Sequence, residues 1–209
     1  MAGVAVVLLA IGATGCGSTA ARQATGLDAS REPAHGAQRT QPREATAGAM
    51  ADGSATATSV VRTQLDTLML RYDAATSALL ERLSDAADPT AATTTAYLSV
   101  FAPTSAFALG ALASWAHEAA QGHTYRPGPR GQMLATKVTS VEPARSGTVG
   151  FGVCVASSFV LVDSAGQVLE SQGGVGAGRG VAVLVDGQWL LRDLSLRASS
   201  ECSARSGSS

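Results

Sequence analysis

The chain has 209 residues, with 15 basic and 16 acidic side chains and a formal net charge of −1. This balance argues against general nucleic-acid binding, which depends on a strongly basic surface. The chain holds 3 histidines and 3 cysteines, and it contains no CxxC or HExxH spacing, so the sequence predicts no metal site and no cofactor.

The first residues have the order of a secretory leader. An apolar run from Val4 to Ile11 is followed by the small residues Gly12 to Gly15, and then by Cys16. The run is far shorter than the roughly 20 apolar residues that a membrane-spanning helix needs, which favours a cleaved leader. The segment Ala13-Thr14-Gly15-Cys16 resembles the lipobox of bacterial lipoproteins.

That resemblance implies a signal peptide over residues 1–15 and a lipidated Cys16 as the first residue of the mature chain. The protein would then sit on the extracytoplasmic face of the cell membrane, and the membrane would be its partner through the lipid. The pattern departs from the family at Ala13, where leucine is usual, and no basic residue precedes the apolar run. The alternative is an ordinary signal peptide that leaves Cys16 free.

The cysteine count favours one disulfide bond. Lipidation of Cys16 would leave Cys154 and Cys202 as a pair, and an exported protein meets oxidising conditions. We therefore expect a Cys154–Cys202 disulfide, with two separate thiols as the alternative.

Composition divides the rest of the chain into three parts. Residues 16–58 are rich in Ala, Thr, Gly, Ser, Gln and Arg without apolar periodicity, so we expect a disordered tether. Residues 59–202 are long enough for one domain, and residues 203–209 form an expected disordered tail. The tether would hold the domain away from the lipid surface.

The first half of the domain is predicted to be helical. Apolar residues recur every three or four positions between residues 61 and 83, which indicates one helix face, with Ser59 as its N-cap. Asp88-Pro89 ends that pattern. A short helix is expected over residues 90–100, and a third helix over residues 105–119.

The second half is predicted to form an antiparallel meander. Turn signals separate four apolar and β-branched runs, and Asp186-Gly187 is the strongest hairpin signal. The glycine-rich segment 173–180 lacks the Lys-Ser/Thr ending of a phosphate loop, so we expect a bend or bulge in a curved sheet. Helices followed by such a meander predict an α+β fold with the helices on one face of the sheet. The expected strands cover residues 132–142, 147–162, 167–185 and 188–197.

The order of these elements, closing on Gly187-Gln188-Trp189-Leu190-Leu191-Arg192-Asp193, resembles the nuclear-transport-factor-2-like (NTF2-like) fold. The resemblance implies a cone, in which a curved sheet wraps a long helix. Lipobox, tether and domain together are similar to uncharacterised lipoproteins of actinobacterial type. Relatives of this fold include a ketosteroid isomerase and a dehydratase as well as proteins that only bind ligands or partners, so the fold alone does not give a function.

An enzyme of this kind would need a base inside the cone and a donor for the developing oxyanion. Asp193 has the same strand parity as Trp189 and Leu191, so it is a candidate that should point to their face, with an ion pair to an arginine as the plainer role. Tyr72 lies in the apolar stripe of the first helix, and its neighbour Asp73 should face solvent. No local motif of the enzymes matches, and the sequence assigns no catalytic residue. Tyr97, His117 and Asp163 are further candidates, and a solvated helix face for His117 and a turn for Asp163 are the plainer roles. The role of His123, in a Gly/Pro loop, is left open.

These observations favour a non-catalytic lipoprotein that binds a small apolar ligand or another envelope protein. An isomerase or dehydratase with its site in the cone is the alternative, with Asp193 or Asp73 as the base. A purely structural domain of a larger envelope assembly is a third interpretation.

Overall fold

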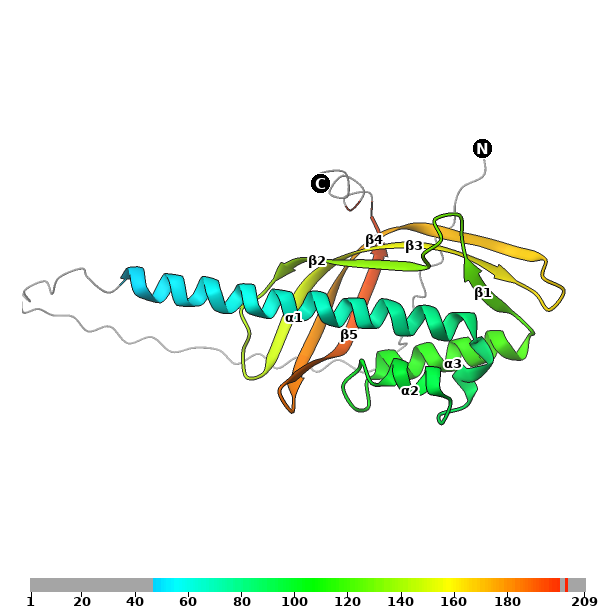
Figure 1. The fold of residues 1–209 in the computed structure, drawn as a ribbon, viewed down its shortest axis with the longest axis horizontal. Helices are drawn as coiled ribbons and strands as arrows, with labels where there is room; N and C mark the ends of the chain where they lie inside the picture. The colour runs from blue at the N-terminus through cyan, green and yellow to red at the C-terminus, as the bar shows by residue number, and fades with distance from the viewer. Residues whose placement is uncertain (1–46, 200–201, 203–209) are drawn as a thin grey trace, which may run out of the picture.

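The computed structural model of the chain describes residues 47–199 and Cys202 (Figure 1). The expected signal peptide, Cys16, most of the tether and the tail lie outside these residues. Within them the elements are α1 (Ala47–Glu81), the 3-10 helix η1 (Leu83–Ala87), α2 (Ala92–Leu98), α3 (Ala106–Ala120), β1 (Thr124–Pro127), β2 (Leu134–Val141), β3 (Thr148–Val162), β4 (Val168–Val185) and β5 (Gln188–Ala198).

The first helix is longer than the sequence predicts. It begins at Ala47, so residues 47–58 are helical where a flexible tether was expected, and Ser59 is not its N-cap. Residues 47–58 contain five alanines, which favour a helix, and two glycines, which oppose it. Extending a formed helix costs much less than starting one, so the element can continue past the apolar stripe without any apolar periodicity. The N-terminal part of α1 projects beyond the sheet in Figure 1.

The five strands form one antiparallel sheet in the order β1-β3-β4-β5, with β2 also paired to β3. β1 pairs with the segment of β3 near Val162, and β2 pairs with the segment from Phe151 to Ser157, so the two short strands share one side of β3. The helices cover one face of the curved sheet (Figure 1). The predicted α+β architecture and its four main strands are confirmed, whereas β1 was not predicted.

The two-residue turns between β2 and β3 and between β4 and β5 carry the expected chemistry. Asp186 and Gly187 have φ values of 50° and 79°, and Ser146 and Gly147 have values of 48° and 69°. Positive φ at both central residues is the type I′ geometry, whose twist matches that of paired strands. The hairpin predicted at Asp186-Gly187 is confirmed.

The interior between helices and sheet is filled by side chains. α1 contributes a buried stripe, which the strands meet with Val149, Phe151 and Val153. An aromatic cluster fills the space among the helices, because the Tyr97 ring centroid lies 4.8 Å from that of Phe101 and 5.2 Å from that of Trp115. The stripe of α1 consists of Leu65, Leu68, Met69, Tyr72, Leu79 and Leu80.

The glycine-rich segment of β4 permits close approach and does not form a bulge. The expectation for this segment was a bend or a bulge, and the bulge is wrong because β4 pairs with β3 through residues 173–180 without a register shift. A Cβ atom on Gly180 would collide with the ring of Phe151, and one on Gly178 would collide with the backbone oxygen of Ser195. The glycines therefore leave room for the core and for β5.

A disulfide bond joins Cys154 on β3 to Cys202, and their Cα atoms are 5.5 Å apart. This is the pairing that the cysteine count favours. The bond closes a loop of 48 residues and holds Cys202 against the sheet.

Two alanine substitutions in β4 test the role of its glycines. Gly178→Ala should lower the free energy of unfolding by about 1–3 kcal/mol, because the new methyl group has no room beside β5. Gly173→Ala is the matched control, since its Cβ would lie 3.4 Å from the nearest atom, an ordinary contact. Urea unfolding of both variants measures the difference, and equal stability would contradict this account.

Removing the disulfide should destabilise the domain. Replacing Cys154 and Cys202 together by alanine should lower the free energy of unfolding by about 2–4 kcal/mol, since a loop of this length gains entropy in the unfolded chain. Denaturant unfolding checks the value. Cys16→Ala, which changes a cysteine outside the described residues, serves as the control and should leave the unfolding free energy within about 0.5 kcal/mol.

Candidate functional site

Asp73, expected to face solvent, is buried where α1 meets β2. Its carboxylate accepts one hydrogen bond from the backbone N–H of Thr136 and one from the Thr136 hydroxyl, each 2.6 Å long. Only 5% of Asp73 is exposed. The expectation of a solvated side chain is wrong because α1 lies along β2, and the helix position beside Tyr72 faces the strand.

A second residue of α1 completes this contact. The Arg62 guanidinium donates to the backbone carbonyl of Val138 at 2.7 Å. β2 pairs with β3 on one side only, so its other side would leave backbone groups without partners. Asp73 and Arg62 satisfy an N–H and a carbonyl on that free edge, which gives both side chains a structural role.

Burial changes the titration of the polar groups next to this contact. Burial raises the pKa of Asp73, and the hydrogen bonds from Thr136 oppose that rise without cancelling it. Burial also raises the pKa of Tyr72, with a further contribution from the charge of Asp73. The Tyr97 pKa is raised by burial as well. Both tyrosines therefore stay protonated at physiological pH and could serve only as hydrogen-bond donors or acceptors.

The Tyr97 hydroxyl on α2 has no hydrogen-bond partner among the described residues. The Thr76 hydroxyl on α1 has no well-aligned partner there, but it lies close enough to the Tyr72 hydroxyl to oppose the rise of the Tyr72 pKa. Thr76 is 2% exposed and Tyr97 is 0% exposed. A buried hydroxyl without a partner costs free energy, and such groups are uncommon in folded proteins.

Asp193 points to the surface and not into the cone. The register of β4 and β5 shifts between Val181 and Ala182, which pair with Asp193 and Leu191 respectively. Arg192 is thereby the extra residue of a β-bulge, and the bulge reverses the alternation that placed Asp193 beside Leu191. Leu194 takes the buried position, with 3% of its surface exposed. Among the described residues Asp193 forms no ion pair, so the expected partner arginine is also absent there.

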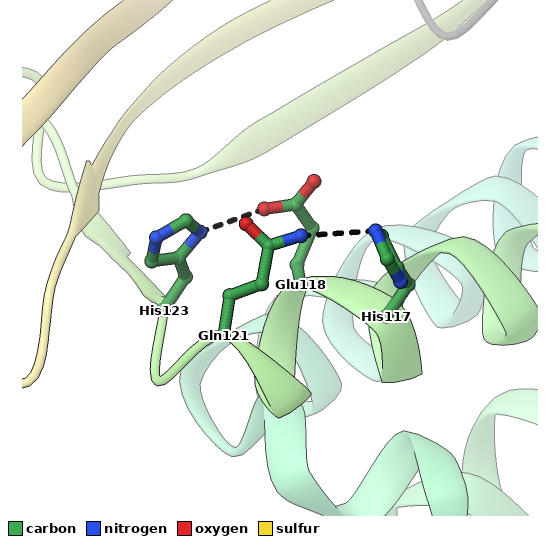
Figure 2. Close-up of polar contacts among 4 residues, drawn as sticks. All are labelled: His117, Glu118, Gln121 and His123. Carbon is green, nitrogen blue, oxygen red and sulfur yellow. Dashed lines mark hydrogen bonds and ion pairs between the residues drawn. The ribbon is translucent and has the colours of Figure 1, made fainter.

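His117 and His123, the two histidines among the described residues, lie at the C-terminal end of α3 (Figure 2). The Nδ1 atom of His123 lies 2.8 Å from a carboxylate oxygen of Glu118, and the Nε2 atom of His117 lies 2.9 Å from the side-chain nitrogen of Gln121. The backbone N–H of His123 also donates to the Glu118 carbonyl. These contacts satisfy groups at a helix C-terminus, so the cluster has a local structural explanation. Within the described residues no three His, Cys, Asp or Glu side chains gather in a way that could hold a metal ion.

Asp163 has the turn role that the sequence predicts. Its carboxylate accepts hydrogen bonds from the backbone N–H groups of Ala165 and Gln167. This is ordinary chemistry for aspartate at a turn between strands.

A cavity of about 410 Å³ lies beside β2, and no local sequence pattern predicts it. Its walls come from α1, β2, β3, β4 and Cys202, which meet only in the folded chain. The lining residues are Arg62, Ala135, Thr136, Lys137, Val138, Thr139, Cys154, Val155, Ala156, Val175 and Cys202.

Among the described residues no helix has the length and apolar character required to cross a bilayer.

No known family model and no curated protein matches this chain. Solved structures with a similar arrangement include the intermembrane space region of the chloroplast protein ARC6, with a TM-score of 0.49 and 14% identity, over 66% of this chain and 97% of that one. Aln2 from a Streptomyces species has a TM-score of 0.40 and 15% identity, over 70% and 95%. A Streptomyces avermitilis protein from the NTF2-like family has a TM-score of 0.37 and 12% identity, over 68% of this chain and 97% of that one. These likenesses concern the fold and assign no ligand or activity to this chain.

The pKa of Asp73 predicts a pH-dependent contribution to stability. Its folded-state pKa lies above the ordinary value of 3.8, so the folded protein holds this proton more tightly than the unfolded chain does. The contribution of Asp73 is therefore fully present below the unfolded pKa and declines as pH rises through the folded pKa. The stability advantage of the natural protein over Asp73→Asn should be larger at pH 4 than at pH 7, as measured by denaturant unfolding.

The stability difference between the natural protein and Asp88→Asn should change with pH in the opposite direction. Hydrogen bonds from the hydroxyl and backbone N–H of Thr90 lower the pKa of Asp88, so its contribution is lost as pH falls through that lowered pKa. An Asp73→Asn difference that grows with pH would show that the Thr136 hydrogen bonds outweigh burial.

Proposed function

We propose that this protein is a lipoprotein of actinobacterial type, anchored through Cys16 at the extracytoplasmic face of the cell membrane. Its NTF2-like domain would bind a ligand or an envelope partner without catalysing a reaction. The leader pattern and the lipobox resemblance support the anchor. The Cys154–Cys202 disulfide supports an oxidising compartment, because such bonds are rare in the cytosol.

The observation that carries the non-catalytic interpretation is the position of the two candidate bases. Asp73 uses both carboxylate oxygens on Thr136 at the edge of the sheet, and Asp193 lies on the surface. A general base must reach the proton that it removes, and neither group faces an open pocket inside the cone. The interior is instead filled by aromatic and aliphatic side chains such as Phe101 and Trp115.

One observation favours the alternative, an isomerase or dehydratase. Hydroxyl groups and a carboxylate of raised pKa lie close to the interior of the cone, and the Tyr97 hydroxyl lacks a described partner. These groups belong to Tyr72, Asp73, Thr76 and Tyr97. A reaction in the cone would require the aromatic cluster to open. Soaking crystals with a planar ketone distinguishes the two, because density among these residues would support the enzyme, whereas an unchanged core supports the binding domain.

The decisive experiment is the intact mass of the protein extracted from membranes. We expect a mass that starts at Cys16 with a diacylglyceryl group added, and a gain of two hydrogen atoms on reduction of the disulfide. Cys16→Ser is the control and should give an unlipidated chain in the soluble fraction. An unmodified native protein in the soluble fraction would contradict the anchored function and leave Cys16 as a free thiol.

A further inference from the structure

The cavity beside β2 combines an apolar floor with two cationic side chains. Cys154 pairs directly with Lys137 on β2, and Ala156 pairs with Ala135. Residues paired directly across two strands share a face of the sheet, so Lys137 lies on the face that carries the disulfide. Val175 pairs with Ala156 from the other side and extends the same floor. All five residues line the cavity.

Among the described residues that line this cavity, the charged side chains are both positive. Lys137 is the only lysine of the chain and is exposed, and Arg62 lies at the same cavity with its guanidinium at the edge of β2. The ion pairs within residues 47–199 are His123–Glu118 and Arg179–Glu142, so neither cation is neutralised by a described carboxylate. The carboxylate of Asp73 is bonded to Thr136 and is not among the groups that line the cavity.

We propose that this cavity binds a single-chain amphiphile with an anionic head group, such as a fatty acid. This inference rests on the proposed binding function and names its ligand class. The acyl chain would lie along Ala135, Ala156, Val175 and the disulfide, and the head group would contact Lys137 and Arg62. The cavity has a volume of about 410 Å³ and is open to solvent on one side. Its lining is mostly apolar with a few polar groups, as in ligand sites whose polar groups fix the orientation of the ligand.

The charge and the floor each exclude other ligands of similar size. An inorganic anion would leave the apolar floor uncovered. Its attraction to the two exposed cations alone would be weak, because salt screens it. A neutral amphiphile would leave both cations without a counter-charge. The combination selects a molecule that is apolar along its length and negative at one end.

The test uses the full chain with Cys16→Ser, so that the protein carries no acyl chain of its own. The probe is the fluorescent fatty acid dansylundecanoic acid, and its methyl ester is the neutral control. We expect saturable binding of the acid and weaker binding of the ester. Lys137→Gln should weaken binding of the acid by about two- to five-fold and leave binding of the ester unchanged. Arg62→Gln should weaken binding of the acid by a similar factor.

Matched variants separate the site from general effects. Arg126→Gln removes an exposed arginine on β1, away from the cavity, and should leave binding of the acid unchanged. Ala156→Phe fills the floor and should abolish binding, whereas Ala165→Phe places the same ring on the exposed turn between β3 and β4. Thermal unfolding of each variant checks that loss of binding does not reflect loss of the fold.

Three results would overturn the proposal. Equal affinity for acid and ester would remove the role of the cations, and full binding by Ala156→Phe would place the probe elsewhere. If the acid bound only to a chain shortened to end at Cys202, residues 203–209 would be the natural occupant of the cavity. Because the mass experiment tests the anchor independently, a lipidated native protein without fatty-acid binding would refute the ligand class alone.

Discussion

The free edge of β2 is the constraint on which the arrangement of this domain depends. A strand with one neighbour exposes a row of backbone N–H and carbonyl groups, which attract other chains unless they are covered. Here α1 lies along that edge, and Asp73 and Arg62 supply the acceptor and the donor that Thr136 and Val138 need. The same helix presents its apolar stripe to the core, so one element both fills the cone and closes its edge.

The opposite edge of the sheet, formed by β5, is covered by backbone pairing with another segment. The segment between α2 and α3 pairs with β5, since the Leu191 N–H donates to the Val100 carbonyl and the Ala102 N–H donates to the Leu191 carbonyl. Ser105 donates to the Arg192 carbonyl and also caps the N-terminus of α3. The bulge at Arg192 therefore lies where the segment between α2 and α3 contacts β5, and the bulge leaves Asp193 exposed.

The sequence predicted the elements well and the relations between distant elements poorly. Alternation and turn residues such as Asp186-Gly187 are local signals, so β2, β3, β4 and β5 were placed within two residues of their ends. β1 is four residues long and ends at a proline, so it is too short to show an alternating sequence pattern. The bulge at Arg192, the burial of Asp73 and the cavity at Lys137 depend on which strand or helix lies alongside. No periodicity within one segment carries that information.

The length of α1 has a mechanical consequence. At 1.5 Å per residue, 35 residues of helix extend about 52 Å, and the N-terminal portion continues past the sheet as a stiff rod (Figure 1). A force applied at Ala47 would be transmitted along this lever to the places where the helix contacts the sheet. The short hydrogen bonds between Asp73 and Thr136 would bear that load in shear, and the orientation of the sheet would follow the orientation of the rod.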